Sequence, residues 1–441
     1  MSAPAVTSLD AHAAYNRSRI FLVSVLALLT AGMSFALRSL ITPALKTTFF
    51  DPIDFVNAGN LVGQTLGVAF LGFAITIAIG SPLLDALGMH RLLPLSSLCF
   101  IAGTAVLIFA GRIEQGASVT WVIWSAALII GIGWGLTETV INPLIATLYP
   151  ETKTEKLNVL HAWWPGGVIL GSLAGLALAE TGLNWQWQIA LTFIPALITL
   201  SLSIGVKFPP TERAAAGVSF GAMFRELRRP LFIILWLSMF LTAASELAPA
   251  QWVEFALTKT VGMHGIILLT YVSGLMFVMR HFAGPLVHKL SPIGLLWFSC
   301  LLASIGLVAL SLANSPVTGL LAATVWGVGV CYMWPTMLAT ASERFPRGGA
   351  LLIGLMGTAG TLSSFLLLPR LGRVYDSTAI REAGGASALK ALAGPALEQI
   401  ENIAARTSFR VVAICPAVLL IVFGAIWLYD RSRGGYRPEK L

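Results

Sequence analysis

Gly131-Ile-Gly-Trp-Gly-Leu-Thr-Glu138-Thr-Val-Ile-Asn142-Pro143 decides the fold, together with Leu157-Asn158-Val-Leu-His161-Ala-Trp-Trp164-Pro165, which follows a short charged loop over 150–156. A carboxylate, two amides and an imidazole stand here inside runs that are otherwise apolar. Moving such groups into hydrocarbon is expensive, so their presence needs a reason. The stretch predicts a functional site in the interior of a membrane protein, where a substrate and a coupling ion bind.

The composition of the whole chain excludes a soluble domain. Of its 441 residues 56% are hydrophobic and only 11% are charged, whereas a soluble domain carries roughly 25% charged residues. The basic isoelectric point near 9.5 does not indicate nucleic acid, because the basic residues lie in short loops between apolar runs. The four cysteines are scattered through apolar runs without paired spacing, so we expect neither disulfides nor a metal site, and no cofactor.

Twelve apolar runs are long enough to cross a bilayer, which needs about 20 residues in a helix. They predict an all-α membrane protein, in two groups of six, at 20–44, 57–79, 91–111, 121–147, 157–179, 187–206, 231–257, 265–286, 292–313, 317–341, 349–369 and 409–429.

The loop charges predict the orientation of these spans. With the N-terminus inside, eighteen of the 28 Lys and Arg residues lie on the inner side and nine on the outer side, while Arg38 falls within the first span. Lys and Arg concentrate on the cytoplasmic side of membrane proteins. We therefore expect a multi-pass protein of the bacterial inner membrane with both termini in the cytoplasm, and no cleavable signal peptide.

The sequence divides into three parts. Residues 1–206 form an N-terminal six-helix bundle, 207–230 a cytoplasmic linker that ends in a basic amphipathic helix, and 231–441 a C-terminal six-helix bundle. In the last part, the polar stretch 370–408 predicts an outer loop with an amphipathic surface helix near Ala386 to Ala405.

Internal repeats relate the two bundles. Gly80-Ser-Pro-Leu-Leu-Asp-Ala-Leu87 recurs as Ala283-Gly-Pro-Leu-Val-His-Lys-Leu290, and Gly131-x-Gly133 recurs as Gly327-x-Gly329. The offsets are close to half the chain length, which indicates two pseudo-symmetric halves in parallel orientation with a binding site between them.

A signature between spans 2 and 3 carries a family resemblance. Gly80-Ser-Pro-Leu-Leu-Asp85-Ala-Leu-Gly88-Met-His-Arg91 resembles the loop 2–3 signature of the major facilitator superfamily. The resemblance extends over the whole chain and implies the major facilitator fold. It also implies that Asp85 caps a neighbouring helix and that Arg91 latches the two halves on the cytoplasmic side, which is a gating role. In the second-half copy, His288-Lys289 replaces the aspartate.

Further motifs resemble the fucose:proton symporter branch of that superfamily. They are Glu138-Thr-x-x-Asn142-Pro143, Leu157-Asn158, Ala244-Ser-Glu246 and Met333-Trp334-Pro335-Thr336. The resemblance implies that Glu138 lines a central cavity and takes part in proton coupling and sugar recognition. The chain departs from the branch at Arg38-Ser39, where the branch has an Asn-Asp pair, and at His161 and Trp164, where it has Gln and Asn.

The chemistry of the interior side chains points to the same region. Glu138 and Asn142 are four residues apart and share a helix face. Glu138 is interpreted as a cavity-facing carboxylate that binds a proton or a substrate hydroxyl, since burial favours the protonated form of a carboxyl. The alternative is a structural partner of Arg38 or of backbone freed at Pro143. Glu246 is either a gate in a helix broken at Pro249 or an interfacial carboxylate.

Arg38 allows three interpretations. It can clamp a substrate carboxylate or phosphate, form a structural or gating pair with Glu246 or Glu138, or extend outward to the interface. We favour the pair. Asn158 and His161 begin span 5, and either could bind substrate. Trp164, Trp252 and Trp334 offer aromatic faces that suit a sugar ring, although most tryptophans in such proteins serve packing or interface anchoring.

These observations predict a secondary transporter, not an enzyme, that moves a small polar solute by alternating access, with a sugar or polyol favoured and H⁺ as the coupling ion. We expect a monomer in a lipid bilayer, without nucleic-acid partners. The alternatives are an organic-anion or lipid-like solute with Arg38 as clamp, Na⁺-coupled symport, and a receptor on a transporter fold that moves no soluble substrate.

Overall fold

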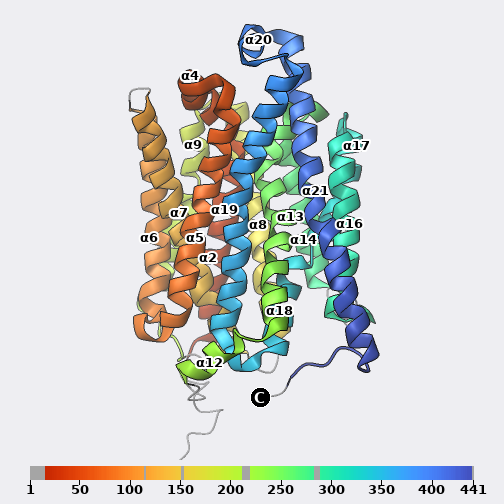
Figure 1. Cartoon of the computed structure of the whole chain (residues 1–441). Helices are drawn as coiled ribbons and strands as arrows, with labels where there is room; N and C mark the ends of the chain where they lie inside the picture. Colours follow the sequence, from red (N-terminus) through yellow and green to blue (C-terminus); the bar gives the residue numbers. More distant parts are fainter. Residues whose placement is uncertain (1–14, 114–115, 150–152, 211–218, 283–288, 440–441) are drawn as a thin grey trace, which may run out of the picture.

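The computed structural model describes residues 15–439, apart from 114–115, 150–152, 211–218 and 283–288. Within these ranges the chain is built from helices that run side by side in one elongated bundle (Figure 1). The short helix α12 (Phe220–Glu226) and the C-terminus lie at one end of this bundle, and α20 (Ala386–Ala391) lies at the other. We name these the α12 end and the α20 end.

The first half of the chain supplies six crossing segments. These are α2 (Arg17–Leu40), α5 (Ala58–Leu87), α6 (Met89–Ala110), α7 (Ala117–Leu148), α8 (Lys153–Glu180) and the pair α9 (Trp185–Ala190) with α10 (Phe193–Ser203). Four short turns connect α2 to α5, namely α3 (Thr42–Leu45), a π-helical turn η1 (Lys46–Phe50), α4 (Asp51–Asp54) and η2 (Phe55–Asn57).

The second half supplies six more segments. These are α13 (Pro230–Val261), α14 (Gly265–His281), α16 (Pro292–Leu312), the pair α17 (Pro316–Val330) with α18 (Met333–Arg344), α19 (Gly349–Glu382) and α21 (Gly394–Ser432). The turn η4 (Pro346–Gly348) joins α18 to α19.

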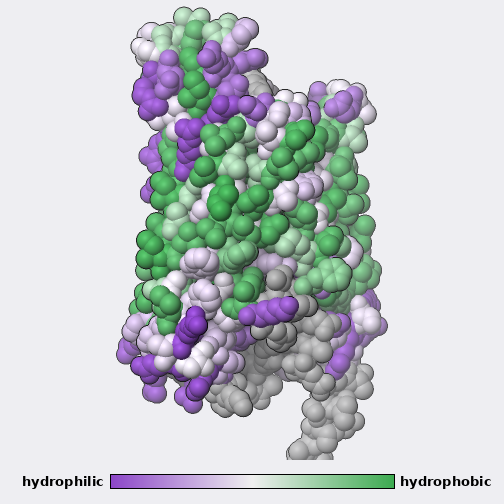
Figure 2. Space-filling view, turned by 90° about the vertical axis from the view of Figure 1, so that its right-hand side faces the viewer, coloured by the Kyte–Doolittle hydropathy of each residue, from purple (hydrophilic) through white to green (hydrophobic). Residues whose placement is uncertain are grey.

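Every predicted span corresponds to a helix or a pair of helices. Eleven segments of the described chain are long and apolar enough to cross a bilayer, and α14 is a shorter apolar helix of 17 residues. On the face shown in Figure 2, apolar side chains form a broad belt across the middle of the molecule, with hydrophilic side chains gathered towards both ends. This surface matches a hydrocarbon layer between two polar interfaces.

The predicted outer loop over 370–408 is wrong. Helix α19 continues to Glu382, and α21 already begins at Gly394, so only the short α20 and its connections separate them. The amphipathic part near Ala386 to Ala405 is therefore mostly the first turns of a helix of 39 residues, which continues into the last span. Likewise, α8 begins at Lys153, inside the predicted loop 150–156.

Three helix pairs bring the two halves together, namely α5 with α19, α8 with α14, and α2 with α13. Glycines set the separation of the first pair. A Cβ atom on Gly63 of α5 would overlap the Leu368 carbonyl oxygen, and one on Gly372 of α19 would overlap that of Gly59. Small residues allow such close backbone approach between membrane helices. Near the α12 end the same pair meets again, where Gly354 lies against Ser81.

Candidate functional site

A chain of polar side chains runs from α7 to α8 in the buried interior. The Asn142 Nδ2 donates to Glu138 Oε2 at 2.8 Å, and the Asn142 Oδ1 lies 2.8 Å from His161 Nε2. The predicted shared helix face of Glu138 and Asn142 is thus confirmed by a direct contact. Because Asn142 offers an acceptor to the imidazole, His161 must present a protonated Nε2 for this hydrogen bond to form. These hydrogen bonds therefore connect the imidazole of His161 to the carboxyl of Glu138 through one amide.

Arg280 of α14 carries the interaction into the second half. Its Nη1 donates to the His161 carbonyl oxygen at 3.3 Å, and its Nε donates to the Cys331 carbonyl oxygen at 3.0 Å. Both carbonyls lie four residues before a proline, Pro165 and Pro335. Proline has no N–H, so each of these carbonyls lacks its usual intrahelical donor. One guanidinium thus satisfies two carbonyls freed by prolines in opposite halves.

The same guanidinium pairs with a buried carboxylate. Arg280 Nη2 lies 3.5 Å from Glu246 Oε1 of α13, and both side chains are almost fully buried. Glu246 Oε2 has no hydrogen-bond partner within the described chain. The interfacial interpretation of Glu246 is therefore wrong. The count of loop charges assigns Arg280 to the inner side, although this residue falls near the end of the predicted span 265–286, and the structure buries it instead.

Arg38 does not form the pair that the sequence favoured. Glu246 pairs with Arg280, and Glu138 bonds to Asn142, whereas Arg38 Nε and Nη1 have no partner among the described residues. Arg38 is nevertheless only 5% exposed, so it does not extend to the interface either.

An aromatic cluster lies on the same side of α2. Phe35, three residues before Arg38, contacts Trp164 with ring centroids 5.0 Å apart and Trp134 at 6.0 Å. The two indoles stack on each other, with an interplanar angle of 17°. Residues three apart on a helix share a face, so Arg38 and this cluster belong to one region of the first half.

The remaining predicted residues are two tryptophans of the second half and Asn158. Trp252 of α13 packs on Phe255 and Tyr375, while Trp334 of α18 lies against Gly360 of α19. Asn158 lies in the first turns of α8, and its side chain falls outside the described structure.

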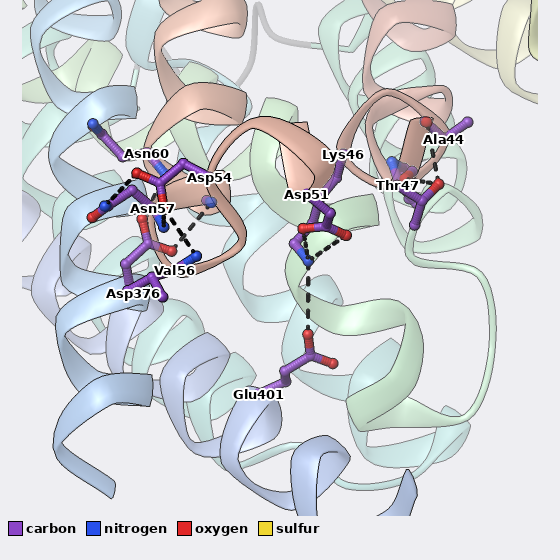
Figure 3. Close-up of polar contacts among 12 residues, drawn as sticks. Ala44, Lys46, Thr47, Asp51, Asp54, Val56, Asn57, Asn60, Asp376 and Glu401 are labelled. Carbon is purple, nitrogen blue, oxygen red and sulfur yellow. Dashed lines mark hydrogen bonds and ion pairs between the residues drawn. The ribbon is translucent and has the colours of Figure 1, made fainter. Parts of the chain in front are cut away.

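At the α20 end, a carboxylate from the second half caps a helix of the first half. Asp376 of α19 accepts from the backbone N–H groups of Gly59 and Asn60, at 3.1 and 2.8 Å, in the first turn of α5 (Figure 3). The free N–H groups and positive dipole end of a helix favour a carboxylate at this position. The sequence missed Asp376, because the residue fell in the supposed loop 370–408.

Two further contacts join the halves near this end. Lys46 lies between Asp51, at 2.9 Å, and Glu401 of α21, at 4.0 Å (Figure 3). Deeper in the bundle, Ser39 donates to the Gln251 carbonyl oxygen at 3.0 Å, and Gln251 Nε2 donates to that of Phe35 at 3.2 Å. The halves are thus in contact from the α20 end to the interior.

The predicted gating pair lies at the α12 end. Asp85 stands in the last turn of α5 and Arg91 in the first turn of α6, and both are exposed. Gly88 joins the two helices with a φ of 82°, a left-handed conformation that suits glycine. The second copy of this signature, over 283–288, lies outside the described residues, so the latch remains a prediction.

Three comparisons relate the chain to known proteins. The family model described as Major Facilitator Superfamily matches residues 17–368. The glucose transporter GlcP of Staphylococcus epidermidis is 24% identical over 44% of this chain, and the match spans only 40% of that relative's length. The xylose transporter XylE from E. coli, in a partially occluded inward-open conformation, has a TM-score of 0.71 at 17% identity, with 92% of this chain and 97% of that chain covered. FucP, in an outward conformation, has a TM-score of 0.62 at 17% identity, with 92% and 98% covered.

Proposed function

The chain belongs to the Major Facilitator Superfamily, as the resemblance of its motifs predicted, and it is a multi-pass integral membrane protein and not an enzyme. From this premise we propose that it is a proton-coupled secondary transporter that moves a sugar or related polyol by alternating access, acting as a monomer. The names of similar proteins support the solute class, since they include a glucose transporter and a D-xylose–proton symporter.

The buried chain of Glu138, Asn142 and His161 carries the proposal. It ends at the imidazole of His161, and the main-chain carbonyl of the same residue accepts from Arg280 of the other half, so the chain lies close to the contact between the halves. Glu138 bonds to an amide and forms no ion pair within the described residues, which suits a group that binds a proton together with the solute. Protonation and solute binding at this place can then bias the contact between the halves.

Closure at the α20 end supports alternating access as the mechanism. The loop charges favour the α12 end as the cytoplasmic side and the α20 end as the outer side. In the present arrangement, Asp376 and Gln251 hold the outer parts of the halves together. Rocking of one half against the other would break these contacts and open the interior to the outside.

The test is uptake into proteoliposomes with labelled neutral sugars, polyols and carboxylates, with an inward proton gradient, without it, and with a Na⁺ gradient. Wild type is compared with Glu138→Gln and with Glu180→Gln as the matched control, because Glu180 is an exposed carboxylate at the end of α8. We expect a neutral or acidic sugar to accumulate only with the proton gradient. Glu138→Gln should still exchange the solute but not concentrate it, and Glu180→Gln should behave like wild type.

Two outcomes would overturn the assignment. Accumulation driven by Na⁺ alone would exclude protons as the coupling ion. A Glu138→Gln variant that concentrates solute as wild type does would remove Glu138 from the coupling mechanism.

A further inference from the structure

Arg38 is a buried cation without a counterion. The side chain is 5% exposed, and its Nε and Nη1 have no hydrogen-bond partner among the described residues. A guanidinium stays charged at every physiological pH, so it cannot escape the cost of burial by losing a proton. Buried charges are normally paired, because an unpaired charge in a low-dielectric interior is strongly unfavourable. Arg38 therefore requires an anion that the described part of the chain does not supply.

The two interior carboxylates that the sequence offered as partners of Arg38 already bind other residues. Glu138 bonds to Asn142 of its own helix, and Glu246 pairs with Arg280. Neither is within ion-pair distance of Arg38 in the described structure. Arg280 in turn uses its nitrogens on Glu246 and on two main-chain carbonyls. The two buried arginines thus differ, since Arg280 is neutralised within the fold and Arg38 is not.

The side chains beside Arg38 in the first half offer donors, while Gln251 Oε1 and Glu246 Oε2 of the second half are buried acceptors without a partner among the described residues. Ser34, one turn earlier on the same face of α2, has a buried hydroxyl without a partner. The indole nitrogen of Trp164, whose ring contacts Phe35, is also buried without a partner among the described residues. An indole N–H can only donate, as can a guanidinium. The group that complements this region must therefore bring several acceptor oxygens and a negative charge.

The position of Arg38 places this region at the contact between the halves. The neighbouring residues on α2, Phe35 and Ser39, bind Gln251 of α13 in the other half. Glu246 lies less than two turns before Gln251 on α13, and its Oε2 is an unpartnered acceptor. One side of the contact thus offers donors and a cation, while the other offers an acceptor suited to a solute hydroxyl.

We propose that Arg38 binds the carboxylate of the transported solute, and that the solute class is a sugar acid, a polyhydroxylated carbon chain or ring with one carboxylate. The proposal deepens the proposed function and rests on it. A single guanidinium matches one carboxylate, whose planar shape and single charge fit its donor geometry. The aromatic cluster of Phe35, Trp134 and Trp164 lies beside it and provides apolar surroundings for the carbon skeleton.

The experiment compares two probes that differ only in charge, D-glucose and D-glucuronate. Binding to purified protein is measured without any ion gradient, by equilibrium binding of the labelled compounds, for wild type, Arg38→Gln and Arg410→Gln. Arg410 is the control, because it bonds to Ser311 within its own half. Thermal unfolding of each variant, with and without probe, reports whether it folds. Parallel samples contain sodium chloride or sodium phosphate in place of the probe.

We expect wild type to bind glucuronate at least about 30-fold more tightly than glucose, since removing one partner from a buried charge pair has an effect of this size. Arg38→Gln should lose this preference while its weak binding of glucose changes less than about twofold. Arg410→Gln should keep the preference for glucuronate over glucose. Should Arg38→Gln unfold, an Arg38→Lys variant with retained charge and reduced preference would support the proposal instead.

Three results would overturn it. Equal binding of both probes by wild type would show that no carboxylate is recognised. Equal loss of both probes in a folded Arg38→Gln variant would give Arg38 a role in positioning helices. A thermal shift that chloride or phosphate alone reproduces through Arg38 would make the counterion inorganic. The two proposals can fail independently. If glucuronate binds through Arg38 but does not accumulate in a proton gradient, the proposed function fails and the carboxylate site stands. If glucose accumulates in a proton gradient and wild type shows no preference for glucuronate, the carboxylate site fails and the proposed function stands.

Discussion

The guanidinium of Arg280 donates a hydrogen bond across the two halves to the main-chain carbonyl of His161, with Nη1 and the oxygen 3.3 Å apart. His161 is also the last member of the polar chain that begins at Glu138. A main-chain acceptor cannot titrate, so this contact holds α8 in place while the side chain of His161 remains available to Asn142. The position of the imidazole therefore depends on a residue in the opposite half.

Arg280→Gln should break the contact between Arg280 and the main-chain carbonyl of His161. The variant leaves Glu246 without its cation and two proline-freed carbonyls without donors, and we expect transport to fall about 100-fold, because breaking a buried pair costs roughly 3 kcal/mol or more. Initial uptake rates into proteoliposomes provide the measurement. The double variant Glu246→Gln/Arg280→Gln should recover part of the loss in thermal stability. Arg280→Gln with unchanged transport would contradict the interpretation.

The link between Asn142 and His161 should depend on a donor at the position of Nε2. A glutamine at 161 can still donate to Asn142, whereas a leucine cannot. We expect His161→Gln to keep most proton-driven accumulation, and His161→Leu to lose about tenfold, since a hydrogen bond missing from a buried network costs about 1–2 kcal/mol. Solute exchange without a gradient should survive in both. Equal behaviour of the two variants would show that the hydrogen bond has no part in coupling.

Asp376→Ala should weaken closure at the α20 end. The variant removes the carboxylate that caps α5 from the other half, and a favourable charge at a helix N-terminus contributes up to about 2 kcal/mol when partly buried. The readout is the labelling rate of a single cysteine at Ser34, in a background without the four native cysteines, with a membrane-impermeant maleimide. We expect labelling from outside to rise by about tenfold.

The matched control for this prediction is Glu382→Gln, which changes a carboxylate farther along α19 that bonds only to its neighbour Arg381. It should label like wild type. An unchanged rate in Asp376→Ala would mean that the capping contact does not limit opening.

Gly63→Ala should hold the halves apart. The new methyl group overlaps the Leu368 carbonyl oxygen of the other half, and overpacking of this kind costs about 1–3 kcal/mol. We expect a lower unfolding temperature in detergent and about tenfold slower transport. Gly274→Ala is the control, because no atom lies within 4 Å of its added Cβ. It should be neutral or slightly stabilising. Equal stability of the two variants would show that α5 and α19 adjust to the methyl group.

The C-terminal tail should give a small pH-dependent stabilisation. Glu439 accepts a hydrogen bond from Arg229 Nη1 at 2.8 Å and forms an ion pair with it. The hydrogen bond and charge of Arg229 lower the pKa of Glu439 below its ordinary value. A lowered carboxyl pKa gives stability that is present above the ordinary pKa of about 4.3 and is lost as the pH falls through the folded-state value.

Because Glu439 is about half exposed, at 47%, the contribution should stay near 0.5 kcal/mol and shrink in high salt. Glu439→Gln should therefore lower the unfolding temperature slightly at pH 7 and leave it unchanged at pH 3. A difference that persists at pH 3 would point to a role for the tail other than this ion pair.

Hydrophobic length and helix periodicity account for what the sequence predicted. Apolar runs placed all twelve spans, and four-residue spacing put Glu138 and Asn142 in contact. Charges near the ends of spans could not be placed in the same way. Arg280 was assigned to the inner side, because a hydropathy pattern does not show whether a charged side chain near the end of a span has a buried partner. Asp376 was hidden because a polar helix outside hydrocarbon has the composition of a loop.

The sequence also could not show which partner each buried arginine binds. The sequence offered Arg38 two interior carboxylates, and the fold gives one of them to Arg280 instead. Nothing local distinguishes the two arginines, since the deciding carbonyls are those of His161 and Cys331, which lie 119 and 51 residues away from Arg280 in the chain.

Helices α19 and α21 extend beyond most of the other helices at the α20 end (Figure 1). At 1.5 Å per residue, the 39 residues of α21 extend for roughly 58 Å, about twice the roughly 30 Å of a hydrocarbon layer. Because α21 is long and projects into water, a small tilt of the second half displaces the end of this helix by a large distance. A fluorophore on the exposed Lys390, in α20, would therefore make the opening and closing of a single molecule visible from outside the membrane.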